Sequence, residues 1–284
     1  MRLLIERIKL AILKRIKVVP QKSYATWLSK GYNDQPEVSV IIQSHNKSIQ
    51  ICHILPKLRQ YKSIEIVVID DGSSMEHTQR LSKALTGANE FLLRANDLYE
   101  NRTYDKAIRF SNGKYIALLQ DDDDFENTRW IDEAVFYFLN NPQMAVLGGK
   151  WALAMEINEA EKQMHGVFID TKRENFEFVP AVNRAPMWIR RDLFDQCLHH
   201  IDFQFAPFQY DDDEICLRAW LSGLQVGWYD AHFKSLSVGG MRLWNNDFTK
   251  EQMKRNSKQL YKMYADKIER VNNFVASSNL SIKA

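Results

Sequence analysis

The sequence predicts an α/β fold in which a mostly parallel central sheet is flanked by helices. Strand-like and helix-like segments alternate regularly between residues 38 and 149, which is the pattern of a parallel sheet. The strand-like segments are apolar at nearly every position, as strands covered on both faces are. Hydrophobic residues make up 45% of the chain and charged residues 26%, a balance that is typical of globular domains and excludes whole-chain disorder.

The first half of the chain carries the strongest pattern. Its apolar, β-branched runs predict strands at 38–42, 64–69, 91–93, 115–119 and 145–147. Helical spacing of the apolar residues predicts helices between these strands, at about 47–60, 75–85, 104–110 and 129–140. Asn112-Gly113 and Asn141-Pro142 end two of these helices.

The second half of the chain is less regular. Short strand-like runs at 166–169 and 186–189 alternate with polar stretches. A helix is expected at about 213–222, where Gly223 ends it. One charged helix is expected over residues 247–270, followed by a frayed tail.

We divide the 284 residues into one domain, 36–245, with an N-terminal basic helical extension and linker, 1–35, and a C-terminal helix and tail, 246–284. Residues 1–20 carry six basic side chains and one acidic side chain. Because the whole chain carries a net charge of +2 and this segment +5, the remaining residues carry −3. A mildly acidic body is not the composition of a nucleic-acid-binding protein, so we expect no nucleic-acid partner.

Residues 2–17 read as a helix with isoleucines at helical spacing and basic residues between them. Two interpretations stay open: a helix on an anionic membrane surface, or a helix packed on the protein's own body. No apolar run approaches the roughly 20 residues that span a bilayer. Three scattered cysteines suit a reducing compartment. We therefore expect a cytoplasmic protein, with peripheral contact at the inner face of the membrane under the first interpretation.

Polar clusters follow three of the predicted strands: Gln43 to Asn46, Asp70-Asp71, and Gln120 to Asp124. In an open parallel sheet, ligands bind beyond the carboxyl ends of the strands, so these loops are expected to line one crevice. Four consecutive Asp residues repel one another and need a compensating cation beside a buried strand. Carboxylate oxygens favour Mg²⁺ or Mn²⁺, which commonly bridge a protein to a diphosphate. A solvated acidic turn is the alternative.

A second acidic cluster, Asp211 to Glu214, begins the helix expected near residue 213. Negative charge is stabilised at a helix N-terminus, and simple capping accounts for Asp211. A carboxylate fixed at the mouth of a crevice can instead act as a general base toward a sugar hydroxyl, which is a poor acid and needs a close, oriented base.

Taken together, these segments resemble the inverting GT-A-fold glycosyltransferases of family two, which use nucleotide-sugar donors. The resemblance rests on residues 38–46, 64–74, 113–123 and 142–149, and on Asp211 to Arg218 followed by Gly223. It covers about residues 36–230. Each motif alone is weakly specific, but the ordered set at family-like spacing is distinctive. The resemblance implies a nucleotide-binding half, 36–125, and an acceptor half, 126–245.

The resemblance also implies roles for individual residues. Gln43 and Asn46 would line the nucleotide, Asp71 would accept a hydrogen bond from the base, Asp121 would lie near the ribose or diphosphate, and Arg102 would contact the diphosphate. Asp122 matches the metal-binding carboxylate of the D-x-D motif, with Asp123 beside it. Asp212 matches the catalytic base, and Asp211 and Trp244 are candidates for acceptor contacts.

The function implied is metal-dependent, inverting, hexosyl-type transfer from a nucleotide-diphosphate sugar to a hydroxyl of a glycan or lipid-linked acceptor, as in polysaccharide biosynthesis. A UDP-sugar is the expected donor, and Mn²⁺ or Mg²⁺ the expected cofactor. Gln120 departs from the family pattern, because many relatives carry the first Asp of D-x-D there. No Q-x-x-R-W motif follows, which argues against a processive polymer synthase.

Two other functions stay open. A sugar-phosphate nucleotidyltransferase shares this kind of sheet but needs a glycine-rich phosphate loop after the first strand, and residues 43–47 do not form one. A catalytically inactive GT-A-like binding protein is the second alternative. The presence of Asp71, Asp122 and Asp212 together argues against it.

Overall fold

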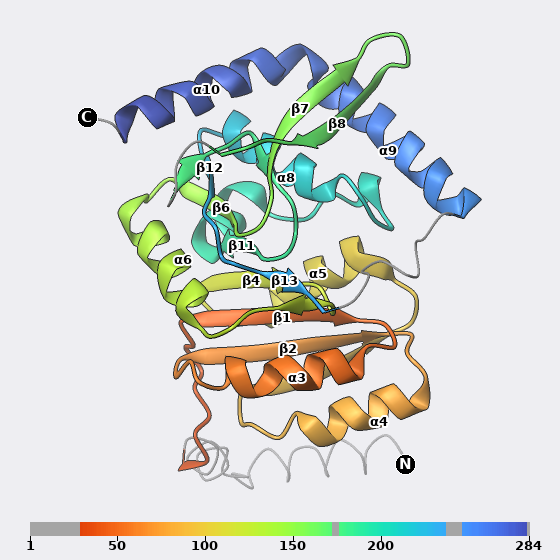
Figure 1. Cartoon of the computed structure of the whole chain (residues 1–284), viewed down its shortest axis with the longest axis vertical. Helices are drawn as coiled ribbons and strands as arrows, with labels where there is room; N and C mark the ends of the chain where they lie inside the picture. The colour runs from red at the N-terminus through yellow and green to blue at the C-terminus, as the bar shows by residue number, and fades with distance from the viewer. Residues whose placement is uncertain (1–28, 172–175, 237–245, 283–284) are drawn as a thin grey trace, which may run out of the picture.

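The computed structural model describes residues 29–171, 176–236 and 246–282, and shows a central sheet flanked by helices (Figure 1). The sheet has eight strands in the order β3-β2-β1-β4-β11-β6-β12-β9. The predicted helix at 2–17 and the acceptor candidate Trp244 lie outside the described residues.

The N-terminal half of the sheet is parallel, as predicted. It consists of β1 (Val38–Ser44), β2 (Ile64–Asp71), β3 (Glu90–Ala95) and β4 (Tyr115–Leu119). The connecting helices are α3 (Ser48–Leu58), α4 (Met75–Ala84) and α5 (Tyr99–Phe110). Helices α3 and α4 pack together, and α5 contacts β1 and β2. All residues of β4 are buried, which explains why its sequence is uniformly apolar.

The other half of the sheet is mixed. It consists of β6 (Met144–Gly148), β9 (Glu177–Phe178), β11 (Met187–Arg190) and β12 (Gln225–Trp228), and α6 (Arg129–Asn140) lies before β6. Strand β11 runs antiparallel to both β4 and β6, β12 is parallel to β6, and β9 is antiparallel to β12. The mostly parallel prediction therefore describes the N-terminal half of the sheet better than the other half.

Smaller elements complete the acceptor half. Strands β7 (Ala152–Asn158) and β8 (Gln163–Phe168) form a hairpin that pairs with β10 (Ala181–Val182), and β5 (Asp123–Asp124) pairs with β13 (Lys234–Ser235). The helices are α7 (Arg191–Leu193), α8 (Asp211–Leu221), α9 (Asp247–Tyr264) and α10 (Ile268–Ser281), with short helical turns at Phe194–Leu198, Phe203–Phe205 and Ala265–Lys267. In Figure 1 the hairpin, α9 and α10 occupy the end of the molecule opposite α4.

Several predicted boundaries change. Strand β4 and helix α6 have the predicted bounds, but α5 begins at Tyr99 rather than near residue 104. Strand β7 was not predicted. The prediction of a single charged helix over 247–270 is wrong, because the chain breaks at 265–267 into two helices. The prediction of a frayed tail is also wrong, because the chain is helical up to Ser281. Among the described residues, no helix has the length and apolar character needed to span a bilayer.

The parallel half contains a buried carboxylate that is satisfied by its neighbours. Ser39 Oγ donates to Glu65 at 2.6 Å, and the backbone and side-chain nitrogens of Asn112 donate to the same carboxylate at 2.8 and 2.9 Å. The Gly113 backbone nitrogen donates to Ser39 Oγ at 2.7 Å. A Cβ at Gly113 would lie 2.3 Å from the Ser39 backbone nitrogen, so only glycine fits at this position.

Gly113→Ala is expected to lower the free energy of unfolding by about 1–3 kcal/mol, because the added methyl group must push β1 away from the start of β4. Urea unfolding followed by circular dichroism measures the change. Ser82→Ala, at an exposed position of α4, is the control and should unfold like the wild type. An unaltered midpoint for Gly113→Ala would contradict the close packing described here.

Candidate active site

The loops at the carboxyl ends of β1 and β2 are fastened to each other. Asp70 is buried and accepts hydrogen bonds from Thr78 Oγ1 at 2.5 Å and from the Ser73 backbone at 3.2 Å. The Asn46 backbone donates to Ser73 Oγ at 2.9 Å, and Asn46 Oδ1 accepts from the Ser74 backbone at 2.8 Å. Asn46, predicted to line the nucleotide, thus also joins the two loops.

Asp71 lies at the carboxyl end of β2, where it joins three segments. Its carboxylate is fully buried and accepts hydrogen bonds from the backbone nitrogens of Leu98 and Tyr99, each at 2.9 Å. Gln43 Nε2 donates to it at 3.2 Å, so two predicted nucleotide-binding side chains touch. These bonds hold the start of α5 against the ends of β1 and β2. The predicted contact of Asp71 with a nucleobase stays a prediction.

The acidic loop after β4 is tied to the loop after β1. Asp121 accepts a hydrogen bond from the His45 backbone at 2.8 Å, and Lys47 Nζ lies 3.7 Å from its other oxygen. Asp124 is neutralised differently, by Lys57 at 2.6 Å. Asp122 and Asp123, between them, are buried, and within the described parts of the chain neither forms an ion pair.

Burial raises the pKa of two carboxyl groups in this loop. The pKa of Asp121 rises to about 6, with burial as the main cause and Asp122 adding to it. The pKa of Asp123 rises to about 7, because burial and the Asp122 charge outweigh the hydrogen bond from the Gln120 backbone. Among the described residues, two lysines from neighbouring segments, Lys47 and Lys57, pair with this loop of four acids.

A divalent cation would fit this donor set. Asp122 and Asp123 offer hard carboxylate oxygens, and a cation between them would replace their mutual repulsion with attraction. The residues described here contain no group of three or more His, Cys, Asp or Glu side chains arranged around a common metal position. The remaining ligands in such a site would be water and phosphate oxygens, as is usual for Mg²⁺.

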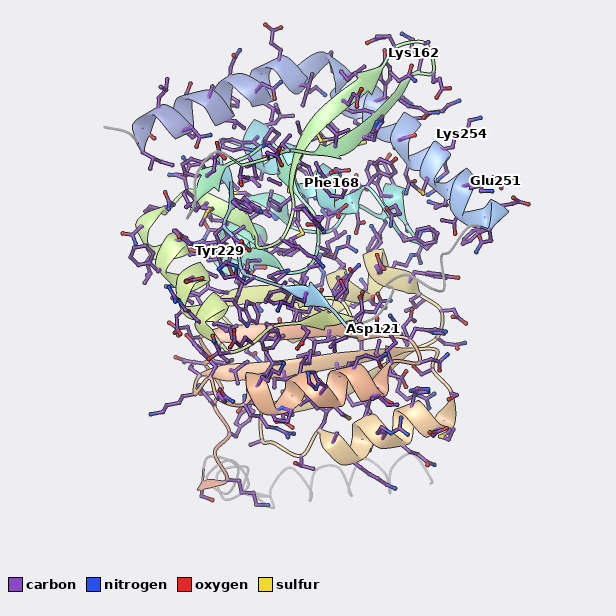
Figure 2. All side chains as sticks on the ribbon, in the orientation of Figure 1. Asp121, Lys162, Phe168, Tyr229, Glu251 and Lys254 are labelled. Atoms are coloured by element: carbon purple, nitrogen blue, oxygen red, sulfur yellow. The ribbon has the colours of Figure 1, made fainter. Side chains whose placement is uncertain are left out.

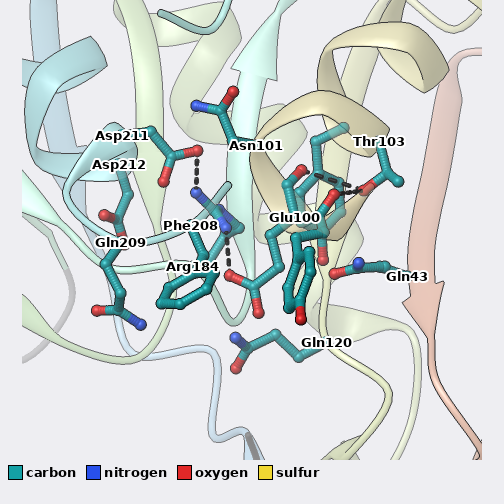
Figure 3. Close-up of polar contacts among 12 residues, drawn as sticks. Gln43, Glu100, Asn101, Thr103, Gln120, Arg184, Phe208, Gln209, Asp211 and Asp212 are labelled. Carbon is teal, nitrogen blue, oxygen red and sulfur yellow. Dashed lines mark hydrogen bonds and ion pairs between the residues drawn. The ribbon is translucent and has the colours of Figure 1, made fainter. Parts of the chain in front are cut away.

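The central cation of the site is Arg184, which the sequence did not reveal. Arg184 lies between β10 and β11, and its side chain is 5% exposed. Its guanidinium forms ion pairs with Glu100 on α5, at 3.0 Å, and with Asp211 on α8, at 2.5 Å (Figure 3). The guanidinium also packs over the Tyr104 ring, with the ring centre 5.0 Å from the guanidinium carbon. Three segments far apart in the sequence meet at this side chain.

These residues border a cavity of about 180 Å³. Every residue that lines it is polar: Glu100, Gln120, Asn183, Arg184, Gln209, Asp211 and Asp212. Gln120 begins the acidic loop, and Asp212 belongs to the first turn of α8. The predicted catalytic base, Asp212, and the first residue of the predicted metal loop, Gln120, thus line the same cavity.

Electrostatics around the cavity favour a basic carboxylate. Burial raises the pKa of Asp212, Arg184 opposes this rise, and Asp211 adds to it. Burial likewise raises the pKa of Glu100 to about 7, against the effect of Arg184. Arg184 therefore interacts favourably with three carboxylates, those of Glu100, Asp211 and Asp212. A carboxylate with a raised pKa accepts protons more readily than an ordinary aspartate does.

The C-terminal helix α9 fixes the loop that leads into α8. Asn256 Nδ2 donates to the backbone oxygens of Phe205, Phe208 and Gln209 at 2.8–2.9 Å. Gln209 and Tyr210 then adopt left-handed backbone conformations, with φ of 70° and 68°. This entry turns the first residues of α8 toward the cavity. Nothing in the local sequence indicates this support, because Asn256 is 44 residues from Asp212.

Arg102, predicted to contact the diphosphate, lies elsewhere. Its guanidinium is 5.5 Å from the centre of the Phe203 ring, its side chain is exposed, and it does not line the cavity. On α5, Glu100 and Tyr104 face the site, and Arg102 falls on another face of the same helix. Arg184 is the cation that lines the cavity, and the predicted contact of Arg102 with a diphosphate stays a prediction.

The model of glycosyl transferase family 2 matches residues 39–198, which is more than half of the chain. The chain belongs to this family. A search of curated proteins finds no match.

Solved structures similar to this family 2 chain share its fold. GalNAc-T7 with UDP, GalNAc and Mn²⁺ gives a TM-score of 0.55 at 16% identity, over 68% of this chain and 42% of that chain. S. aureus TarS (1–349) with UDP gives 0.53 at 17% identity, over 68% and 58%. The mannosyltransferase PcManGT from Pyrobaculum calidifontis, with GDP-Man and Mn²⁺, gives 0.53 at 12% identity, over 89% and 78%. The expected GT-A fold is confirmed.

The raised pKa of Glu100 predicts a pH-dependent stability. In the folded protein Glu100 keeps its proton up to about pH 7, whereas its ordinary pKa is 4.5. Between these values the folded state binds more protons than the unfolded state, so this group lowers the stability of the wild type as the pH rises. Glu100→Gln removes the effect. The free energy of unfolding of the variant, relative to wild type, should rise by about 3 kcal/mol from pH 4.5 to 7.

Unfolding in urea at several pH values measures this difference. Any difference in packing between the two side chains adds an offset that does not depend on pH, because the effect of Arg184 on the charged carboxylate is already part of the raised pKa. Glu126→Gln, at an exposed position after the acidic loop, is the control and should parallel the wild type. If Glu100→Gln also parallels the wild type, Glu100 is ionised in the folded protein throughout this range.

Proposed function

We propose that this family 2 protein is a metal-dependent, inverting glycosyltransferase. It transfers a sugar of the hexosyl type from a nucleotide-diphosphate donor to a hydroxyl of a glycan or lipid-linked acceptor, with Asp212 as general base. The observation that carries the proposal is the shared cavity, because Asp212 and Gln120, the first residue of the acidic loop, both line it. Family membership and the fold support the same reaction class.

The donor nucleotide would lie across the carboxyl ends of β1, β2 and β4. Gln43 and Asp71 touch there, and Asn46 and Asp121 belong to the adjoining loops. Ligands of open α/β sheets bind at this edge. Solved relatives of the same fold bind UDP, UDP-GlcNAc or GDP-Man, and we propose a UDP-sugar for this chain.

Asp122 and Asp123 would hold the metal ion, Mn²⁺ or Mg²⁺. When bound, the ion supplies positive charge that stabilises the departing nucleoside diphosphate. The surplus of negative charge in this loop supports the assignment, since a buried group of carboxylates with raised pKa values gains most from a cation. Two of the solved relatives of this fold contain Mn²⁺.

Asp212 would take the proton from the acceptor hydroxyl while the oxygen attacks the anomeric carbon. The bond between that carbon and the diphosphate oxygen breaks on the opposite face, so the configuration inverts. The carboxylate has the properties that this step requires. It belongs to the first turn of α8, accepts a hydrogen bond from the Asp213 backbone at 3.2 Å, and has a raised pKa.

Arg184 and Asp211 complete the acceptor side of the proposed site. Arg184 offsets the charge of Asp211 next to Asp212, which keeps the base ionised although it is close to another acid. Asp211 retains its predicted role near the acceptor. The roles of Trp244 with the acceptor and of residues 2–17 with a membrane, together with a cytoplasmic location and a part in polysaccharide biosynthesis, stay predictions.

Asp212→Asn is expected to lower sugar transfer by roughly 10²–10⁴-fold, because the amide cannot accept the proton of the acceptor hydroxyl. Affinity for the donor should change little, as measured by calorimetry with UDP-sugars and Mn²⁺. Proton NMR of the product should show an inverted anomeric configuration. Asp266→Asn, at an exposed turn, is the control. Full activity of Asp212→Asn, or a product with retained configuration, would contradict the mechanism.

Metal dependence is tested on donor hydrolysis, which needs no acceptor. Treatment with EDTA should abolish release of the nucleoside diphosphate, and Mn²⁺ or Mg²⁺ should restore it. Asp122→Asn should raise the Mn²⁺ concentration needed for half-maximal activity by about tenfold or more. Asp124→Asn is the matched control, because that carboxylate pairs with Lys57. Activity that resists EDTA, or an unchanged Mn²⁺ requirement in Asp122→Asn, would contradict the assignment.

A further inference from the structure

Two large aromatic rings lie together on the surface of the acceptor half. Trp151 precedes β7 and is 47% exposed, and Phe168 ends β8 and is 69% exposed. Their ring centres are 5.0 Å apart with an angle of 48° between the planes. Figure 2 labels Phe168 on the β7–β8 hairpin. Single exposed rings are ordinary, but two rings in contact form a continuous apolar patch, which is a candidate contact surface.

This aromatic pair adjoins the catalytic cavity. The Trp151 backbone nitrogen donates to Asn183 Oδ1 at 3.1 Å, and the Asn183 backbone nitrogen donates to the Trp151 oxygen at 3.3 Å. Asn183 itself lines the cavity that contains Asp212. Paired backbone segments are about 5 Å apart, so the Trp151 backbone lies directly beside the residue that borders the cavity.

The pair also lies on the side of the hairpin that meets the catalytic helix. A Cβ at Gly166 would lie 2.9 Å from Asp213 Oδ1 and 3.0 Å from the Leu153 side chain, so this face of the hairpin packs on the first turn of α8. Phe168 pairs with Leu153 and is two residues from Gly166, which puts it on the same face. Trp151 shares that face, because it contacts Phe168.

Residue 150 connects the opposite side of the pair to the acidic loop. Lys150 Nζ donates to Ser235 Oγ at 3.0 Å, and Ser235 pairs with Asp123 between β13 and β5. The aromatic pair is therefore placed between the loop that would hold the metal and the helix that carries the base. Neither ring lines the cavity itself; the pair lies beside it through the contact of Trp151 with Asn183.

We propose that Trp151 and Phe168 form a stacking platform for a sugar ring of a saccharide acceptor. This inference rests on the proposed function and identifies the acceptor as a saccharide that is longer than the unit that reacts. Aromatic rings offer a flat apolar surface with little loss of side-chain entropy, which suits the C–H face of a pyranose. The entirely polar cavity beside them suits its hydroxyl groups.

The charge of the cavity lining limits which acceptors can bind there. Three acids and one arginine line the cavity, so it is net negative and would repel a carboxylate or phosphate at the reacting unit. The reacting unit of the acceptor is therefore expected to be a neutral sugar rather than an anionic one. A docking protein would require a far larger apolar surface than two rings bordered by polar groups.

The experiment measures binding at the platform directly. The full chain is labelled with 5-fluorotryptophan, and the ¹⁹F resonance of Trp151 is assigned with Trp151→Phe. The probes are p-nitrophenyl monosaccharides and disaccharides of glucose, galactose, mannose and N-acetylglucosamine, with glucuronide as the anionic comparison. We expect a neutral disaccharide to shift the Trp151 resonance at lower concentration than its monosaccharide, and the glucuronide not to shift it. A resonance that no glycoside shifts overturns the proposal.

Kinetics provide the second measurement. With the best glycoside as acceptor, Trp151→Ala and Phe168→Ala should each raise KM by about tenfold while kcat changes less than threefold. Trp151→Phe keeps a ring and should recover most of the affinity. Phe136→Ala, which removes an exposed ring from α6, is the control and should match the wild type. An unchanged KM in Trp151→Ala, or no recovery in Trp151→Phe, overturns the platform.

Two further outcomes separate this proposal from others. If the wild type with Mn²⁺ hydrolyses none of a panel of UDP-, GDP- and dTDP-sugars, the proposed function fails, whatever the resonance shows. If light scattering shows a dimer that Trp151→Ala dissociates, the pair is an interface between copies and the platform is overturned. We expect donor hydrolysis and the same molar mass for wild type and variant.

Discussion

The arrangement of the site follows from the cost of placing several carboxylates together where little water reaches them. Asp121, Asp123, Glu100 and Asp212 all have pKa values raised by burial, and each contributes to the repulsion felt by its neighbours. On the proposed acceptor side, the buried guanidinium of Arg184 reduces this repulsion by pairing with Glu100 and Asp211. On the donor side the lysines are fewer than the acids, and this difference is what a metal ion and its diphosphate would balance.

Rigid support explains how such a strained set of charges stays in place. Asp71 accepts three hydrogen bonds that connect β1, β2 and the start of α5, so the carboxyl edge of the sheet behaves as one unit. Asn256 does the same for the loop before α8. Because catalytic groups act only in a narrow range of geometries, the residues that hold the loops matter as much as those that face the cavity.

The sequence predicted the parts of the fold that depend on local pattern. Strand β4 and helix α6 were placed with their bounds, since continuous apolar runs and helical spacing are strong signals. Helix α5 was begun five residues late, because its first turn contains Glu100 and Asn101, polar residues that face the protein interior. The break at 265–267 carries neither Gly nor Pro, so nothing in the local sequence marks it.

Residues of the candidate site also differ in whether a local sequence pattern indicates them. Acids that follow strands or begin a helix were found from their position in the motif. Arg184 and Glu100 were missed, because a buried ion pair between residues 84 positions apart leaves no periodic trace. Arg102 was chosen because the site needs a cation, and its contact with the diphosphate stays a prediction. Arg102 lies against the Phe203 ring and Arg184 borders the cavity, so a charge requirement can be read from a sequence more easily than the side chain that meets it.

The two halves of the sheet differ in the same way as their proposed tasks. The nucleotide half is a regular parallel unit whose strand ends meet at one edge, an arrangement that favours a common kind of ligand. The proposed acceptor half mixes parallel and antiparallel strands, and its β7–β8 hairpin rests on α8 through Gly166. Such a hairpin can vary in length and surface without disturbing the parallel unit. Differences in acceptor among proteins of this fold are therefore expected to concentrate in this hairpin and in the loops beside it.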